Sequence, residues 1–372
     1  MTHDASMGSP SWMQRALGYW FEPAPPTNLA VSRALFYTGL LVFYWNDDFS
    51  GWGSVSRAFW MPMPAFEAFG LRPLSADALS VVQTGWRVAL GLSAVGLFTR
   101  ASMVAAAALG FYLLGLPHNF GHLYHFDALL VIAMLALSCS RAGDACSLDS
   151  WLAGRESPAP SGEYTWPIRV VWLSMSLVFL GAGLSKLRHG GSEWILSSNM
   201  AIILTRAAYN VSDADPLTTA GLWIAARPWL AESVALLTLT IELTFASALV
   251  SVRARVVLVP AAAAMLLGIR ALMGPTFAGF LITNVFWVPW DAVGARLAAW
   301  NGARSKEDQP PGRIWPRRGR PDPSAEDGGP SLAKHRGHMD EIPPRLCDYS
   351  DSRERLRDAC SAVPVAGTDE VA

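Results

Sequence analysis

Residues 167–186 read PIRVVWLSMSLVFLGAGLSK, an apolar run that ends in a lysine. Its length matches the about 20 residues that an α-helix needs to cross a bilayer. Seven further apolar runs predict helices of the same kind, at residues 29–45, 79–99, 101–116, 123–140, 231–250, 256–273 and 275–293. We therefore expect an all-α, polytopic integral membrane protein, a bundle of about eight transmembrane helices.

Composition supports one helical membrane domain, at residues 29–295. The chain has 372 residues, of which 52% are hydrophobic and only 16% are charged. Its formal net charge of -1 gives no reason to expect a nucleic-acid partner. Residues 1–26 lack the basic-then-apolar pattern of a cleaved signal peptide, so we expect the first spanning helix to target the chain. Residues 1–28 are the expected N-terminal cytoplasmic segment. Residues 296–372 are rich in Pro, Gly and charge, which predicts a disordered polar tail.

The arginines give an orientation. One set of arginines lies at the termini, in the connections that follow the second, fourth and sixth expected spans (the even-numbered connections), or at the span ends beside them: Arg15, Arg33, Arg100, Arg141, Arg155, Arg169, Arg253, Arg255 and Arg296. The other side carries Arg57, Arg72, Arg188, Arg206 and Arg227, within longer segments at 52–72 and 193–228 whose aromatic residues suit the membrane interface. The positive-inside bias then predicts that both termini are cytoplasmic. Cys139 and Cys146 would face the cytoplasm as free thiols.

Lys186 is the only lysine among the first 305 residues. An ammonium group can lose its proton when apolar surroundings depress its pKa, whereas a guanidinium group effectively cannot. A lone lysine at the end of a membrane helix is therefore a candidate base. It can equally act as an anchor that reaches the lipid headgroups. Gly181 and Gly183 lie just before it, and small residues let a neighbouring helix approach.

Three histidines cluster ahead of the fourth apolar run, at His118, His122 and His125. If a helix starts at Pro117, their spacing places all three on one face, and Asp127 points to the opposite side. Such a cluster is consistent with interfacial hydrogen bonding, with proton transfer or with a metal site.

Arg87 lies within the second expected span, Glu242 within the sixth and Arg270 late in the seventh. A charge at bilayer depth is costly, so it normally faces the bundle interior with a partner. We expect Glu242 to pair with Arg87 or Arg270. The pair would either fix the packing of the helices or take part in chemistry.

The order of these features resembles one known family. A histidine-tyrosine segment and an apolar span lead to Ser147-Leu148-Asp149, followed by FLGAGLSKL at 179–187, Trp194 and Ile241-Glu242-Leu243. This order resembles the vitamin K-dependent gamma-carboxylases and their bacterial relatives, the horizontally transferred transmembrane domain (HTTM) family. The resemblance covers the membrane domain and implies a bacterial cytoplasmic membrane location.

The resemblance implies a quinol-dependent activity. In that family a lysine matching Lys186 deprotonates vitamin K hydroquinone, and oxygen then converts the anion to a strong base on the way to the epoxide. That base removes a proton from the γ carbon of a glutamate, to which CO₂ adds. The site opens to the outer side, and a histidine matching His122 lies in it as a hydrogen-bonding or proton-relay group. The resemblance thus implies Lys186 and His122 as catalytic residues, reduced vitamin K or menaquinol as cofactor, and no metal.

The chain departs from the animal carboxylases at three points. It carries a short polar tail where they have a large strand-rich domain, Ser185 where they have a second lysine, and Gly268-Ile269-Arg270 where the family often has a histidine. What the resemblance predicts is the shared membrane fold and a pocket for a quinone-type or lipid-like ligand. His118, Tyr124, His125 and Trp194 are further candidates for lining it.

Two other functions stay open from the residues alone. The charges at Arg87, Glu242 and Arg270 are compatible with a non-enzymatic transporter or a partner-binding subunit. The three histidines are compatible with a metalloprotein.

Overall fold

The computed structural model describes residues 11–121, 125–210, 216–275 and 277–307. The chain divides into two units, Met1–Pro310 and Pro311–Ala372, and every described residue lies in the first. The described residues form helices and no strand; the only extended pairing among them is an isolated bridge between Ala24 and Ser161. The all-α fold predicted from the sequence is confirmed.

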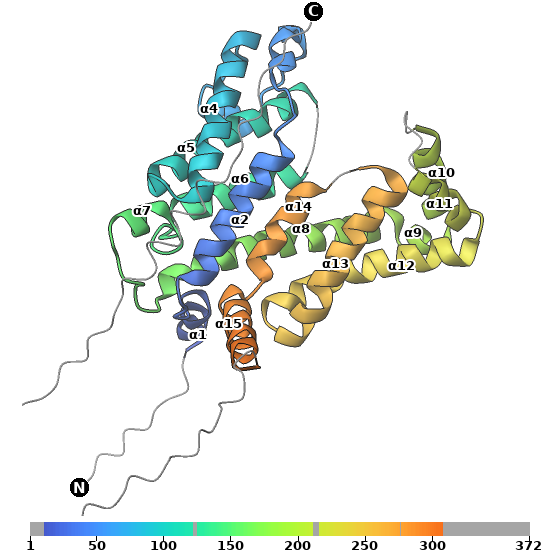
Figure 1. Cartoon of the computed structure of the whole chain (residues 1–372). Helices are drawn as coiled ribbons and strands as arrows, with labels where there is room; N and C mark the ends of the chain where they lie inside the picture. Colours follow the sequence, from blue (N-terminus) through green and yellow to red (C-terminus); the bar gives the residue numbers. More distant parts are fainter. Residues whose placement is uncertain (1–10, 122–124, 211–215, 276, 308–372) are drawn as a thin grey trace, which may run out of the picture. The chain divides into compact units, whose positions relative to one another are not determined.

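Four helices from the first half of the chain pack side by side (Figure 1). They are α2 (Thr27–Phe43), α4 (Ala76–Val95), α5 (Thr99–Gly115) and α6 (His125–Ser138). Helix α4 contacts α2. Helices α5 and α6 each contact the helix before them, because short connections favour antiparallel neighbours. Phe36, Leu40, Trp86 and Leu130 are fully buried among them.

The second half is organised by α8 (Trp166–Gly190), which contacts α6 and also α12 (Pro228–Thr244). The short helix η5 (Phe245–Leu249) follows α12 and packs on α8 and α13 (Val252–Met273). Phe179 of α8 lies against Phe245, with 4.5 Å between ring centroids. Helix α8 therefore joins the two halves.

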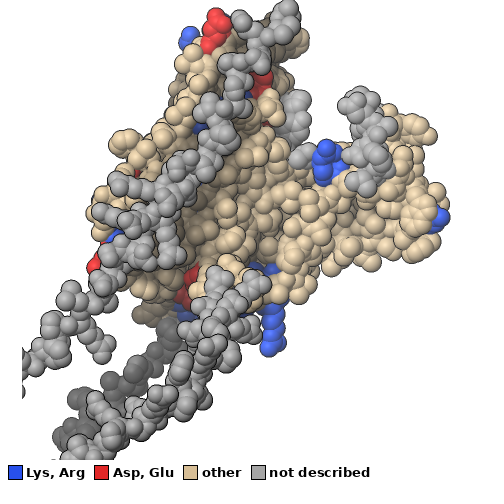
Figure 2. Space-filling model, viewed as in Figure 1, with Lys and Arg blue, Asp and Glu red and all other residues tan. Residues whose placement is uncertain are grey.

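Five of the described helices are long and apolar enough to cross a membrane: Ala76–Val95, Thr99–Phe120, Gly162–Gly190, Pro228–Leu249 and Val252–Met273. Thr27–Phe43, Asp127–Ser138 and Ala278–Trp287 are apolar but shorter. Helix is thus present in all eight predicted runs. The face of the molecule in Figure 2 is largely uncharged, as expected of a surface that meets lipid.

The last predicted span, residues 275–293, is not one helix. It consists of α14 (Ala278–Thr283), η6 (Asn284–Trp287) and the start of α15 (Trp290–Glu307). Val288 is extended, with φ -85° and ψ 126°, because the ring of Pro289 disfavours helical geometry in the residue before it. Helix α15 continues to Glu307, so the polar segment that we expected to be disordered from residue 296 begins as helix.

Short helices fill the longer connections. The α2–α4 connection contains η1 (Ser50–Ser54), η2 (Arg57–Phe59) and α3 (Pro64–Ala68), and η3 (Leu116–Phe120) follows α5. Between α8 and α12 lie α9 (Glu193–Leu196), α10 (Asn199–Asn210) and α11 (Pro216–Ala225). The α10 and α11 helices contact each other, α12 and α13. These two connections are the segments predicted to lie in the membrane interface.

The N-terminal segment and the even-numbered connections meet at one end of the helices. Helix α1 (Trp12–Trp20) is held there by Tyr19, whose hydroxyl donates to Leu249 O at 3.0 Å. Glu22, just after α1, forms an ion pair with Arg169 at the start of α8. The buried Arg33 donates to Ser93 O and Cys146 O, both at 2.6 Å.

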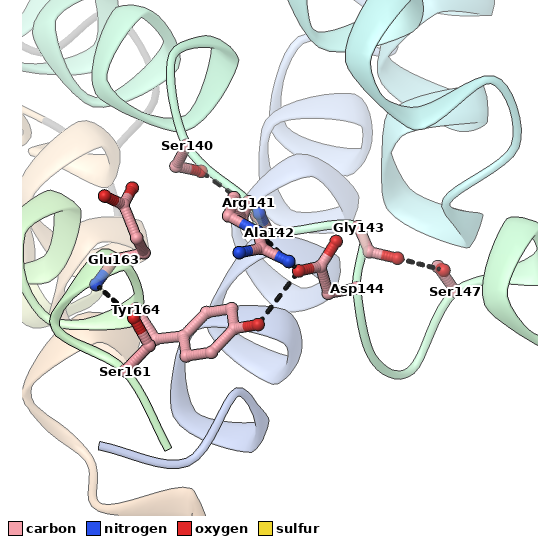
Figure 3. Close-up of polar contacts among 9 residues, drawn as sticks. All are labelled: Ser140, Arg141, Ala142, Gly143, Asp144, Ser147, Ser161, Glu163 and Tyr164. Atoms are coloured by element: carbon pink, nitrogen blue, oxygen red, sulfur yellow. Dashed lines mark hydrogen bonds and ion pairs between the residues drawn. The ribbon is translucent and has the colours of Figure 1, made fainter. Parts of the chain in front are cut away.

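The connection between α6 and α8 contains α7 (Leu148–Leu152) and η4 (Gly162–Tyr164). In it, Asp144 Oδ2 accepts from Arg141 Nε at 2.8 Å and from the Tyr164 hydroxyl at 2.9 Å (Figure 3). Cys139 and Cys146 are exposed free thiols, as predicted.

Candidate functional site

The α8–α12 contact depends on Gly183. A Cβ atom at Gly183 would lie 2.9 Å from Leu243 Cδ2 and 3.2 Å from Glu242 Cβ, closer than such atoms normally approach. Gly181, by contrast, has open space where a Cβ would point. Of the two glycines expected to admit a neighbouring helix, Gly183 does so and Gly181 does not.

One helical turn beyond Gly183, Lys186 reaches across to α12. Its Nζ lies 2.5 Å from Glu242 Oε1, and the two side chains are 21% and 8% exposed. The ammonium group also lies 5.3 Å from the ring centroid of Trp194, in α9. Cation, carboxylate and indole therefore form one cluster, which we call the Lys186 cluster.

Two polar atoms of this cluster have no hydrogen-bond partner among the described residues. Glu242 Oε2 and Trp194 Nε1 are both buried, and neither forms a hydrogen bond with any residue that the structure describes. Buried polar groups are normally paired, because each unmade hydrogen bond costs about 1–3 kcal/mol. The two atoms thus keep an unused hydrogen-bonding capacity next to Lys186.

The Lys186 cluster lines an apolar cavity of about 820 Å³. The cavity lies among α8, α10, α12 and α13, and its walls include Phe179, Met200, Leu237, Met265 and Phe280. Its volume is within the about 300–1,000 Å³ of small-molecule sites, which typically combine apolar walls with a few polar groups. An aromatic or isoprenoid ligand fits these walls, and Lys186 and Glu242 supply the only charges among the residues that line the cavity.

The pairing of Lys186 with Glu242 corrects the expected partners of the charged residues. Arg87 is half-buried and donates to Trp45 O and Asp47 O, at 2.7 and 2.8 Å. It thereby fixes the end of α2 to α4. Arg270 is exposed in the last turn of α13, so its predicted burial is wrong. A guanidinium at a helix end can reach outward, which removes any need for a buried partner.

The histidine cluster also differs from the expectation. The predicted continuous helix from Pro117 is interrupted at Gly121, whose φ of 83° belongs to the left-handed region. The break turns the chain, so that His118 Nε2 lies 3.0 Å from Asp127 Oδ2 instead of on the opposite side. Asp127 Oδ1 also accepts from the Tyr44 hydroxyl at 3.4 Å.

The other histidine positions are not tested by the structure. His122 and Tyr124 lie outside the described residues, and of His125 only its place at the start of α6 is described. Within the part of the chain that the structure describes, no three potential metal-ligating side chains gather. Sequence reasoning missed the Tyr44–Asp127 contact and the lining residues from α10 and α13, because no local pattern marks which faces of distant helices meet.

The chain matches a known family of membrane domains. The family model described as HTTM domain matches residues 21–272, which include every member of the Lys186 cluster. No curated protein and no solved structure matches the chain.

Proposed function

The chain belongs to the HTTM domain family, and from this membership we propose that it is a membrane enzyme that binds a lipid-soluble quinol beside Lys186 and deprotonates it there. Reduced vitamin K or menaquinol is the expected ligand, with oxygen, and CO₂ for a carboxylation, as co-reactants. We further propose that the site opens to the outer face of a bacterial cytoplasmic membrane and that both termini are cytoplasmic.

The observation that carries the proposal is the place of the lysine. Its amine lies at the wall of an apolar cavity of about 820 Å³, and this volume and lining suit a lipid-soluble ligand. A lysine that served only as a lipid anchor would point into the headgroups, whereas Lys186 contacts Glu242 of a neighbouring helix.

The Lys186–Glu242 pair gives the proton a route. When Glu242 Oε1 takes a proton from the ammonium group, Lys186 Nζ becomes a neutral amine that can accept the proton of a ligand hydroxyl. At the end of this exchange Glu242 is neutral, and the ammonium of Lys186 faces the ligand anion. A quinol bound there supplies the acidic hydroxyl and the electrons for the reaction with oxygen.

The test is quinol-dependent epoxide formation by the purified protein in detergent, with vitamin K hydroquinone and with menaquinol. We expect product from the wild type and none from Lys186→Ala or Lys186→Arg, since arginine stays protonated. Arg188→Lys is the matched control, because Arg188 is an exposed cation on the same helix. Product from Lys186→Arg at the wild-type rate would show that Lys186 is not the base.

The non-enzymatic alternatives find less support. A transport path lined by Arg87, Glu242 and Arg270 would need these charges to share one passage, but Arg87 donates to Trp45 O and Asp47 O and Arg270 is exposed. Ligand binding by a wild-type protein that forms no epoxide with either quinol would favour a transporter or a partner-binding subunit.

A further inference from the structure

Glu242 Oε2 and Trp194 Nε1 differ in hydrogen-bonding character. The indole N–H is a donor only, and an ionised carboxylate oxygen is an acceptor only. Both are buried and have no hydrogen-bond partner within residues 11–121, 125–210, 216–275 and 277–307, and both belong to side chains that line the cavity. The wall beside Lys186 thus presents one unsatisfied donor and one unsatisfied acceptor.

We propose that Glu242 and Trp194 form a hydroxyl-binding site that selects the reduced, hydroxyl-bearing form of an aromatic ligand over its oxidised, carbonyl form. This inference rests on the proposed function for the identity of the ligand as a quinol. A hydroxyl group satisfies both atoms, since its oxygen accepts from Trp194 Nε1 and its hydrogen is donated to Glu242 Oε2.

A quinone satisfies only half of this site. Its carbonyl oxygen accepts from Trp194 Nε1, but it has no hydrogen to give, so Glu242 Oε2 stays buried and unpaired. A site built to bind a hydroxyl rejects an analogue without one, because its own polar group is left unmatched. We expect the quinone to bind about tenfold or more weakly than the quinol.

Glu242→Gln should reverse this preference. Lys186 needs an acceptor 2.5 Å away, so the amide oxygen of the glutamine takes the place of Oε1. The amide NH₂ then takes the place of Oε2, and the acceptor of the site becomes a donor. A quinone carbonyl accepts from that donor, whereas the hydrogen of a quinol hydroxyl no longer has an acceptor.

The experiment is equilibrium binding to the purified, full-length protein under anaerobic conditions, so that no turnover occurs. The probes are a short-chain menaquinol, the matching menaquinone and the dimethyl ether of the quinol, which keeps the oxygens but lacks the hydrogens. For the wild type we expect the quinol to bind about tenfold or more tightly than either other probe. In Glu242→Gln the quinone should bind more tightly than the quinol.

One further variant separates the roles of the two residues, and two others serve as controls. Trp194→Phe removes the donor that both redox forms use, so it should weaken both by a similar factor and preserve their ratio. Glu232→Gln and Trp223→Phe are the matched controls: Glu232 lies on the same helix as Glu242, and neither residue lines the cavity. Both controls should bind like the wild type.

Equal wild-type affinity for the quinol and its dimethyl ether would overturn the inference, and this comparison needs no variant to fold. An unchanged preference in a folded Glu242→Gln protein would also overturn it. Lys186-dependent epoxide formation together with equal binding would defeat the inference and leave the proposed function standing. Selective binding of the quinol without epoxide formation would support the hydroxyl-binding site and contradict the proposed function.

Discussion

Lys186 Nζ and Glu242 Oε1 lie 2.5 Å apart, although 56 residues separate them in the chain. The contact joins α8 to α12 beside the cavity and balances the charge of a lysine within largely apolar surroundings. The lysine is thus directed at a neighbouring helix and a ligand space. This relationship links the packing of the two helices to the chemistry proposed for them.

Replacing Glu242 alone should destabilise the protein. Glu242→Leu leaves the mostly buried ammonium of Lys186 without a partner, and losing one member of a buried pair costs about 3–5 kcal/mol. The double variant Lys186→Met with Glu242→Leu should recover most of that loss, because no charge is left unpaired. Thermal unfolding in detergent measures both, and a double variant no more stable than the single one would contradict the pairing.

Gly183→Ala should separate α8 from α12. The added methyl would meet Leu243 at 2.9 Å, so we expect a loss of about 1–3 kcal/mol in unfolding free energy and weaker quinol binding. Gly181→Ala is the matched control, because its added methyl would point into open space and alanine favours helix. Similar effects of the two substitutions on binding would argue against a role for the close contact.

Asp149 accepts hydrogen bonds at the start of α5 and should make the free energy of unfolding depend on pH. Burial raises the pKa of its carboxyl group, but hydrogen bonds from Thr99 and Phe98 outweigh that effect, and the pKa is lowered overall. The stabilisation is therefore fully present above the usual aspartate pKa of about 3.9 and is lost as pH falls through the lowered value.

The corresponding variant is Asp149→Asn. It should cost about 0.5–2 kcal/mol at neutral pH, as loss of a helix N-cap does, and remove this part of the acid dependence. Unfolding curves across acidic pH provide the measurement, with the exposed Glu156→Gln as control. An acid dependence identical to that of the wild type would exclude Asp149 as its source.

Arg33→Lys should weaken the end of the bundle where α2 and α4 meet the α6–α8 connection. The fully buried guanidinium donates to Ser93 O and Cys146 O from two different nitrogens. A single ammonium group cannot reproduce that fork, and a lost charge-assisted hydrogen bond costs about 1.5–3 kcal/mol. Arg100→Lys, at an exposed site, should leave the melting temperature unchanged, and an equal effect of both would refute this account.

The helices themselves could be predicted from local sequence. All eight apolar runs contain helix, because an apolar segment of sufficient length favours helix in a membrane whatever its neighbours are. The errors fall at single residues. Gly121 adopts a left-handed conformation that interrupts the expected histidine helix, and Pro289 forces Val288 out of the helix predicted through residue 293.

The site was predictable only in part. Lys186 stood out because it is the only lysine in the first 305 residues, and Glu242 because carboxylates are rare inside apolar runs. Neither observation says that the two meet, and the sequence offered Arg87 and Arg270 as equally reasonable partners.

The sequence by itself thus determined an all-helical membrane protein with a lone lysine at the end of one span and a carboxylate in the middle of another, because hydrophobic length and charge are properties of local segments. The tertiary structure alone decided that Lys186 faces Glu242, that Trp194 stands beside them and that the three border one cavity. The physical reason is that such contacts depend on how far each helix is rotated and where it crosses its neighbour. Here Gly183 sets that crossing, through a close approach to Leu243 that cannot be read from either helix alone.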